Sequence, residues 1–440
     1  MENEVTVVDS IMGTGKTSWA IQFMNEHPEQ HYVFVTPFLD EVKRIIKSCP
    51  DGYFCQPDYR NGRKIDDFNM LLMEGRNIVV THSTFSNATE ETYEYIANGN
   101  YILFLDEVLD ILVDFNDATN DNITHDDIKL MLQKDFISFD GCGKVEWKTE
   151  SYLDSKYGNV ERIARNGNLY YLDGNLYWQF PPKIFTCFQK MYLLTYLFDG
   201  SLLKPYFEYH EIPYELAGVC KDSNGKYELT GRRDDKEERR RLKELITICS
   251  DRKLNAYDAE SLSMDWFKRA SKGNRKHLIR LRTNLYNYFR NIAKAKSSEI
   301  MWSCPKDYMT KLQGKGYTET RKPTSEEREA LQNISKAEQE RFRKKLKCFV
   351  PCNARATNDF RERSVLAYAL NKYVNPQIKN YFSYKNRVSK TNIAVNQDKL
   401  ALSQLIQWIW RSRIRDGKPI MIYIPSTRMR NLFMEWLDGK

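Results

Sequence analysis

The sequence lacks any run of about 18 consecutive apolar residues, the length that a membrane-spanning helix requires. Its first ten residues form neither a basic cluster nor an apolar segment, so we expect no secretory signal. The few histidines and the nine cysteines are scattered, and no set of them has the spacing of a zinc site. An odd number of scattered cysteines favours reduced thiols in a cytoplasmic compartment.

No repeat of fixed period is present, which argues against a solenoid. A chain of 440 residues with 41% apolar residues has enough material for two or three domains with buried cores. Lys and Arg number 67 against 59 Asp and Glu, a net charge of +8. This surplus suits a polyanionic partner but does not by itself identify one.

Short apolar runs alternate with helical stretches over the first hundred residues, at residues 5–8, 32–35, 77–81 and 101–105. This alternation predicts a parallel sheet covered by helices on both faces. A further strand is expected at residues 191–197. We therefore predict an α/β domain over residues 1–212.

An insertion into this first domain is expected near residues 113–185. It begins with a stretch rich in Asp and Asn, and later two aromatic runs flank Asp173-Gly174, which is a hairpin signal. The hairpin is either a pin that separates duplex strands or a purely structural element. The second interpretation is favoured, because nothing in the sequence of the hairpin requires a further role.

The second half, residues 213–440, is more basic and is predicted to be a second sheet-bearing domain. We expect a basic helical region near residues 232–298 and a charged insertion near residues 319–347. The insertion carries a helix-capping pattern at residues 323–327. Strands are expected at residues 300–304, 349–350 and 420–424, and helices at residues 364–373, 400–415 and 429–437.

The strongest chemical signal is Ser-Ile-Met-Gly-Thr-Gly-Lys-Thr at residues 10–17, between a predicted strand and a predicted helix. Glycines allow backbone N–H groups to surround phosphates, Lys reaches the β- and γ-phosphates, and the Thr hydroxyl holds Mg²⁺. The first glycine of the usual pattern is Ser10 here. The expected ATP-binding residues are Gly13, Thr14, Gly15, Lys16, Thr17 and Ser18.

A second signal is Asp106-Glu107, which follows an apolar strand. At the carboxyl end of a parallel strand, near a phosphate loop, Asp106 would hold Mg²⁺ and Glu107 would polarise the attacking water. The plainer alternative, a helix-capping Asp after a buried strand, is disfavoured once the phosphate loop is considered.

Together these motifs resemble motifs I and II of the superfamily 2 helicases, and are most similar to the DEAD/DEAH-like helicases of bacteriophages. They are more distantly similar to viral origin-binding helicases. Further segments match in order along the chain: Thr-Pro at residues 36–37 followed by Glu41, Thr-His-Ser at residues 81–83, Thr195, Ala-Thr-Asn-Asp at residues 356–359, and residues 407–415. The match at Thr195 is partial, and the glycine expected before Arg411 is Trp410.

The resemblance implies two RecA-like domains in tandem, with ATP and Mg²⁺ bound in a cleft between them and a nucleic-acid strand running across both. It implies DNA rather than RNA and a host cytoplasm. The implied strand-binding residues are Thr36, Pro37, Thr81, Ser83, Arg355, Thr357 and Asn358. Thr195 and Gln407 would couple hydrolysis to movement, and Arg411 with Arg413 or Arg415 would sense the γ-phosphate.

The helical stretch at residues 266–296 interleaves aromatic residues with Lys and Arg. Stacking combined with positive charge suits a single strand, yet an amphipathic helix pair with its aromatics in the core is the favoured interpretation for the aromatics. The leading functional hypothesis is an ATP-dependent DNA helicase or translocase that acts in phage replication or recombination. The alternatives are an ATP-switched nucleic-acid clamp or loader and, less well supported by the motif series, a metabolite kinase.

Overall fold

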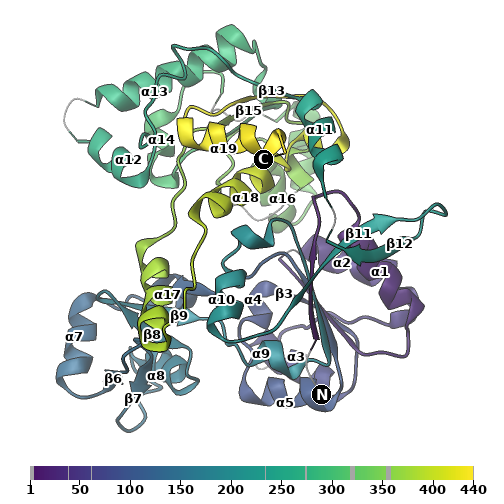
Figure 1. Ribbon diagram of the computed structural model, residues 1–440, viewed down its shortest axis with the longest axis vertical. Coiled ribbons are helices and arrows are strands. Elements are labelled where there is room, and N and C mark those ends of the chain that lie inside the picture. Colours follow the sequence, from purple (N-terminus) through teal and green to yellow (C-terminus); the bar gives the residue numbers. More distant parts are fainter. Residues whose placement is uncertain are drawn as a thin grey trace. The chain divides into compact units, whose positions relative to one another are not determined.

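The computed structural model describes residues 4–37, 39–60, 62–232, 234–272, 275–317, 323–352 and 358–439. The chain divides into two compact units (Figure 1). Unit 1 contains Met1–Arg233 and Val374–Asn396, and unit 2 contains Asp234–Tyr373 and Gln397–Lys440. Each unit is built around a sheet of mainly parallel strands, which confirms the predicted α/β fold class.

The sheet of unit 1 has the strand order β12-β11-β1-β10-β4-β2-β3, and only β12 is antiparallel to its neighbour. Its strands are β1 (Glu4–Asp9), β2 (Tyr32–Thr36), β3 (Ile78–Thr81), β4 (Ile102–Asp106), β10 (Lys190–Thr195), β11 (Glu215–Lys221) and β12 (Tyr227–Gly231). Its helices are α1 (Lys16–Glu26), α2 (Leu39–Ser48), α3 (Lys64–Met73), α4 (His82–Phe85), α5 (Glu90–Asn98), α9 (Ile184–Cys187) and α10 (Leu203–Tyr209).

Alternate residues of β4 belong to two different cores, one on each face of the sheet. Phe104 packs with side chains from α1 and α2, whereas Leu103 and Leu105 pack with side chains from α3, α5 and α10. Burial on both faces explains why these strands read as continuous apolar runs in the sequence.

The expected boundary at residue 212 falls before the observed one. β11 and β12 follow that point, and β11 pairs in parallel with β1. These two strands belong to the edge of the sheet and are half exposed, so they lack the apolar runs that mark the other strands.

The insertion forms a small subdomain with its own apolar core. Its elements are β5 (Leu112–Asp114), α6 (Phe115–Thr119), α7 (His125–Gln133), β6 (Ile137–Phe139), β7 (Val145–Trp147), α8 (Gly158–Arg165), β8 (Leu169–Leu172) and β9 (Asn175–Gln179). The predicted hairpin is β8–β9, with Asp173 and Gly174 both at positive φ, as a two-residue type I′ turn requires. Asp173 at its tip accepts a hydrogen bond from Asn380.

Asn380 belongs to α17 (Pro376–Ser389), which comes from the second half of the sequence yet packs within unit 1 against β8 and α10 (Figure 1). Tyr381 and Phe382 of this helix join the main core of unit 1. The two ends of the segment Val374–Asn396 are joined through Arg428 of unit 2. Arg428 donates to the carbonyl of Lys372, just before the segment, at 2.8 Å and to the carboxylate of Asp398, just after it.

Unit 2 contains a four-stranded parallel sheet of order β13-β16-β15-β14. Its strands are β13 (Ile246–Ile248), β14 (Ile300–Ser303), β15 (Val365–Tyr368) and β16 (Ile420–Tyr423). Its helices are α11 (Lys236–Leu245), α12 (Met264–Ala270), α13 (Lys276–Asn287), α14 (Met309–Leu312), α15 (Ser325–Gln332), α16 (Lys336–Lys345), α18 (Gln397–Ile409) and α19 (Thr427–Leu437).

Two helix predictions in unit 2 are wrong. Residues 365–368 form β15, since this short apolar run is a central strand buried on both faces. The helix expected over residues 400–415 ends at Ile409, and a 3₁₀ turn, Arg413–Asp416, follows it. Arg411 and Arg415 therefore do not lie on one helix face.

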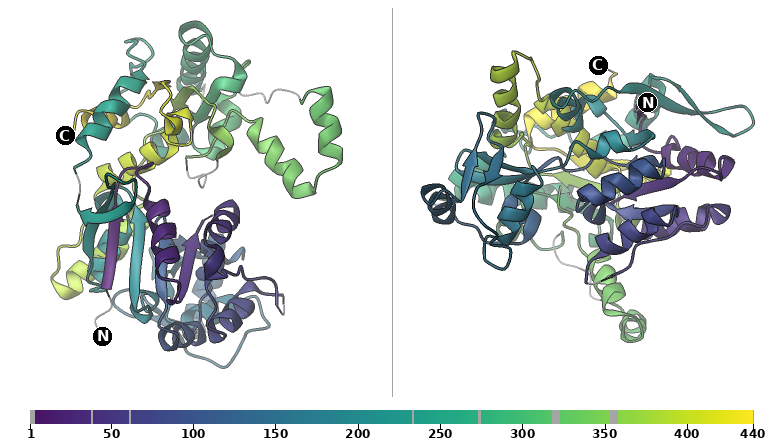
Figure 2. Two further views of the ribbon diagram at one scale, coloured as in Figure 1. Left: turned by 90° about the vertical axis from the view of Figure 1, so that its right-hand side faces the viewer. Right: turned by 90° about the horizontal axis from the view of Figure 1, so that it is seen from below.

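The charged segment predicted near residues 319–347 forms α15 and α16, which project from the rest of unit 2 (Figure 2). The helix cap is confirmed: Thr324 and Glu327 exchange side-chain hydrogen bonds with each other's backbone N–H groups. In the basic stretch, Phe267, Tyr288 and Phe289 are buried in the core, as the amphipathic interpretation predicted, whereas Trp266 is half-buried and Tyr286 is exposed. Among the residues described, no helix is both long and apolar enough to cross a membrane.

Candidate active site

The phosphate-loop sequence lies at the carboxyl end of β1 and leads directly into α1. Gly13 and Gly15 have φ values of 88° and 100°, a left-handed conformation that residues with a Cβ rarely adopt. The Thr14 hydroxyl donates to the carbonyl of Ile11 at 2.8 Å, and Lys16 Nζ donates to the carbonyls of Ser10 and Ile11. The loop is therefore folded tightly, with its ammonium group held over it.

Ser10, which replaces the first glycine of the usual pattern, has a structural role. Its Oγ accepts a hydrogen bond from the N–H of Val219 at 2.9 Å, and its own N–H donates to the carbonyl of Thr195 at 3.1 Å. Ser10 is not among the residues with positive φ, so this position does not need glycine. The serine joins the start of the loop to β11 and β10.

Asp106 is the last residue of β4 and Glu107 follows it, two strands away from β1 on the same carboxyl edge of the sheet. Glu107 has a φ of 65°, and its N–H donates to the carbonyl of Leu194 at 3.1 Å. The carbonyl of Asp106 lies 2.9 Å from Nε2 of the buried His82, the first residue of α4. Contacts from two neighbouring elements thus fix the acidic pair.

Lys16 and Asp106 shift each other's pKa, and the charge of Glu107 acts on both. Burial lowers the pKa of Lys16 to about 8, while the carboxylates of Asp106, Asp9 and Glu107 partly offset this shift. Burial, followed by the charges of Glu107 and Glu41, raises the pKa of Asp106 to about 8. Titratable groups perturbed in this way at a strand edge mark a functional site.

Three members of this site were not among the candidates taken from the sequence: Asp9, Arg44 and His82. Arg44 forms an ion pair with Glu41 at 2.6 Å and, like Lys16, lowers the pKa of Asp106. Arg44 lies three residues after Glu41 on α2, a helical spacing that a search for family motifs passes over.

Asp9, the last residue of β1, is buried, and burial raises its pKa. The backbone N–H groups of Leu197 and Phe198 donate to its carboxylate. Its Oδ1 atom has no hydrogen-bond partner among the described residues. Asp9 therefore connects the phosphate loop with the segment that follows Thr195 and β10.

A magnesium ion fits this arrangement. The described residues contain no group of three or more His, Cys, Asp or Glu side chains that could hold a metal by themselves. Mg²⁺ at a nucleotide site, however, usually takes only one or two protein oxygens and completes its shell with phosphates and water. The residues that would hold it are Asp106, whose pKa is raised by burial and by the charges of Glu107 and Glu41, and Thr17, the second residue of α1.

The expected strand-binding residues of unit 1 differ in exposure. Thr36, at the end of β2, is completely buried, so its hydroxyl cannot reach a bound strand in this conformation. Pro37 and Thr81 are half-buried, and Ser83 is exposed at the start of α4. In unit 2, Arg355 and Thr357 lie outside the described residues, and Asn358 begins a short 3₁₀ turn, Asn358–Phe360.

The expected arginine sensors belong to unit 2 and differ in their surroundings. Arg411 is 8% exposed and lies near the buried hydroxyl of Tyr368. The Arg413 side chain donates to the carbonyl of Pro419, whereas Arg415 is exposed. Gln407 is half-buried on α18, and Thr195 is buried at the end of β10 between β1 and β4.

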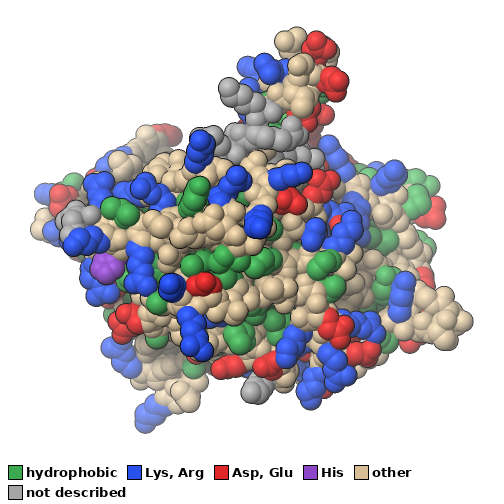
Figure 3. All heavy atoms as spheres, turned by 90° about the horizontal axis from the view of Figure 1, so that it is seen from above, with side chains coloured by type: hydrophobic (Ala, Val, Ile, Leu, Met, Phe, Trp, Pro, Cys, Tyr) green, Lys and Arg blue, Asp and Glu red, His purple; other side chains and the backbone are tan. Residues whose placement is uncertain are grey.

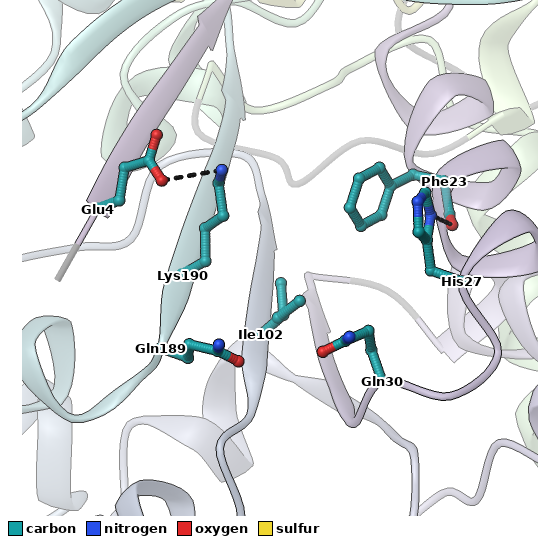
Figure 4. Close-up of a pocket in the computed structure, with 7 residues that line it drawn as sticks. All are labelled: Glu4, Phe23, His27, Gln30, Ile102, Gln189 and Lys190. Carbon is teal, nitrogen blue, oxygen red and sulfur yellow. Dashed lines mark hydrogen bonds and ion pairs between the residues drawn. The ribbon is translucent and has the colours of Figure 1, made fainter. Parts of the chain in front are cut away.

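A pocket of about 440 Å³ lies at the opposite edge of the unit 1 sheet (Figure 4). Glu4 and Lys190, which form an ion pair at 2.9 Å, and Ile102 are the first residues of their strands. Ligands of parallel α/β sheets bind at the carboxyl ends of the strands. The phosphate loop, and not this pocket, is therefore the candidate nucleotide site.

Comparisons with known proteins agree with this architecture. A family profile described as the YonV C-terminal Rossmann-like domain matches residues 240–437, and the YonV middle domain matches residues 119–178, within the insertion. The SPbeta prophage-derived protein YonV of Bacillus subtilis (strain 168) is 37% identical over 452 residues, which cover 99% of both chains.

Among solved structures, an XPD helicase matches with a TM-score of 0.50 and 11% identity, covering 100% of this chain and 94% of that chain. Xpd4 of S. tokodaii matches with a TM-score of 0.47 and 11% identity, covering 99% and 94% of the two chains. The XPD match supports a fold of two RecA-like domains in tandem.

Proposed function

The chain belongs to the YonV family, and we propose that it is an ATP-dependent superfamily 2 motor that moves along or unwinds nucleic acid. The observation that carries this proposal is the cluster formed by Lys16, Asp106 and Glu107. Lys16 and Asp106 shift each other's pKa, and Glu107 acts on both, at the carboxyl edge of a parallel sheet next to a loop with two left-handed glycines. This arrangement suits the hydrolysis of a nucleoside triphosphate.

Each residue has a distinct part in the proposed reaction. The backbone N–H groups of residues 13–18 and the ammonium of Lys16 bind the phosphate oxygens. Glu107 orients the attacking water and accepts its proton. Thr17 and Asp106 hold Mg²⁺, which when bound neutralises charge on the phosphates.

We propose nucleic acid, with DNA favoured, as the polymer. The prophage origin of the 37% identical relative supports a role in phage DNA replication or recombination. Thr81 ends β3, Ser83 lies just after it, and Pro37 follows the neighbouring β2. All three are on the same edge as the phosphate loop, where a nucleic-acid strand would pass near the ATP site.

An ATP-switched clamp or loader is the second candidate. Arg411 is largely buried and Arg413 donates to the Pro419 carbonyl, so the described conformation does not present these two guanidinium groups as γ-phosphate sensors. In enzymes that use such an arginine, its removal slows hydrolysis by a factor of roughly 10³–10⁵. Slow turnover suits a switch better than a motor.

ATP hydrolysis by the purified protein, alone and with single-stranded DNA, duplex DNA or RNA, tests the proposal. Glu107→Gln is the matched control, because it keeps the shape of the side chain and removes the base. A motor requires polymer-stimulated hydrolysis and ATP-dependent strand displacement in the wild type, with both lost in Glu107→Gln. Stimulated hydrolysis without strand displacement or translocation would favour the clamp, and unstimulated hydrolysis would contradict both.

A further inference from the structure

The segment of residues 266–296 has a one-sided charge. It contains ten Lys and Arg residues and no Asp or Glu, although the net charge of the whole chain is only +8. By contrast, α11 contains five Lys and Arg residues together with Glu237, Glu238 and Glu244. A charged helix that only needs to be soluble usually mixes both signs, as α11 does.

Burial divides α13 into two faces. Leu278, Leu281 and Leu285 point into the core of unit 2. The residues exposed on the opposite side recur at spacings of three and four, which keeps them on one face of the helix and its continuation. They are Arg275, Ile279, Arg282, Tyr286 and Arg290. We call these five residues the α13 face.

The α13 face is extended by a neighbouring turn. The Arg290 side chain packs against Gly316, since a Cβ added to that glycine would lie 3.3 Å from Arg290 Cδ. The exposed Lys315 comes directly before Gly316. Burial raises the pKa of Tyr317, in the same turn, and the nearby charge of Arg282 offsets part of this rise. Arg282 and Arg290 form no ion pair with any residue that the structure describes.

Uncompensated positive charges on one surface repel each other and attract a polyanion. Tyr286, with 42% of its surface exposed, lies between Arg282 and Arg290 along the helix. An aromatic ring flanked by guanidinium groups provides stacking for a base and charge for the adjoining phosphates. Figure 3, seen from above the view of Figure 1, shows Lys and Arg side chains scattered over the visible surface, with Asp and Glu side chains among them.

We propose that the α13 face binds single-stranded nucleic acid through its phosphodiester backbone, with Tyr286 stacked on a base. The proposal rests on the proposed function for the identity of the polymer, but it adds a contact surface apart from the helicase motifs. No residue of the phosphate loop belongs to it, so the contact forms without nucleotide. It would keep the strand on unit 2 while the ATP site is empty.

Fluorescence anisotropy with labelled 30-nucleotide single strands of DNA and RNA, in the absence of ATP and over a series of salt concentrations, tests this inference. Each lost phosphate contact should reduce the slope of log K against log salt by about 0.7. Arg282→Gln/Arg290→Gln should therefore reduce the slope by about 1.4 and the affinity by about tenfold. Arg282→Gln/Lys315→Gln should do the same without disturbing the bond from Arg290 to the Ala295 carbonyl.

Arg240→Gln/Arg241→Gln is the control, because it removes two exposed arginines from the mixed-charge α11. It should leave the slope unchanged. Tyr286→Ala should weaken single-strand binding about tenfold and duplex binding little. A wild-type slope in both Arg282→Gln/Arg290→Gln and Arg282→Gln/Lys315→Gln would overturn the proposal and would leave an acidic protein as the better fit.

The result is separable from that of the proposed function. Binding is measured without ATP, so a protein that fails to hydrolyse ATP can still show the salt dependence. Conversely, the inference fails if polymer-stimulated hydrolysis is present but the α13 variants bind single strands like the wild type.

Discussion

The hydroxyl of Tyr381 donates a hydrogen bond to Oε1 of Gln179 at 2.8 Å, across 202 residues of sequence. The same hydroxyl lies 3.3 Å from Nε2 of His210, and the Tyr381 ring stacks on Tyr209 with centroids 4.7 Å apart. These contacts hold α17 in unit 1, although the chain on both sides of it belongs to unit 2. Helix α17 is therefore held in unit 1 by a buried polar network as well as by apolar packing.

Tyr381→Phe should destabilise unit 1 by about 1–3 kcal/mol, because the ring remains but Gln179 Oε1 loses its buried donor. Tyr384→Phe on the same helix is the matched control, since that side chain is only partly buried and packs at the edge of the core. Urea unfolding, with proteolysis of residues 374–396 as a local readout, measures the effect. Equal stability of the two variants would show that the network does not hold α17.

The buried Asp106 predicts a stability that depends on pH. The folded-state pKa is about 8 against an ordinary value of 3.8, so between these values the folded protein binds more protons than the unfolded chain. Stability contributed by this group is therefore lost as pH rises through that window. Asp106→Asn should therefore raise the melting temperature near about pH 6 and raise it further near about pH 9, in buffer without Mg²⁺ and ATP.

Asp106→Asn should also abolish ATP hydrolysis, because an amide cannot replace a carboxylate as the Mg²⁺ ligand. The control for the melting experiment is Asp307→Asn, an exposed carboxylate of unit 2. A gain in stability that is equal at both pH values would contradict the raised pKa of Asp106.

The sequence predicts the first domain well because its signals are local. The phosphate loop, the acidic pair and the buried strands β1, β2, β3, β4 and β10 are each recognisable within about ten residues. What it misses depends on contacts between distant segments. The residues of β15 are predicted to be helical, because an apolar run this short shows neither the helical nor the strand periodicity. Their pairing with β14 and β16 in the tertiary fold makes them a strand.

The same reasoning explains the omissions at the site. His82 is recognisable as part of a strand-end motif. Its contact with the Asp106 carbonyl, however, depends on the strand order β4-β2-β3 in the sheet, which the sequence around His82 does not indicate. Nothing near α17 in the sequence indicates that its partners are Gln179 and Tyr209. Such non-local contacts require the tertiary fold to be known.

Ser10→Ala should destabilise the protein more than it affects nucleotide binding. The buried N–H of Val219 would lose its acceptor, which costs about 1–3 kcal/mol. The hydroxyl is engaged with β11, so the affinity for ATP should change by less than about threefold. Thermal unfolding and nucleotide titration measure the two effects. A large loss of affinity with unchanged stability would place the hydroxyl at the phosphates instead.

Gly15→Ala should be more damaging than its backbone conformation alone predicts. Gly15 has a φ of 100°, and an added Cβ would lie 2.1 Å from Cε1 of Tyr227, whose ring covers the start of α1. Gly225, in the β11–β12 turn, has a similar φ of 83°, but an added Cβ there would meet nothing within 4 Å. Gly225→Ala therefore isolates the cost of the left-handed conformation, about 1–2 kcal/mol.

Gly15→Ala should cost a further 1–3 kcal/mol or so, because the Tyr227 ring must move. It should also weaken ATP binding, since the displaced backbone belongs to the phosphate loop. Tyr227→Ala combined with Gly15→Ala should recover the part of the stability lost to the clash but not the part lost to φ. Equal unfolding free energies for Gly15→Ala and Gly225→Ala would mean that the ring yields without cost. In that case Tyr227 would not restrain the phosphate loop.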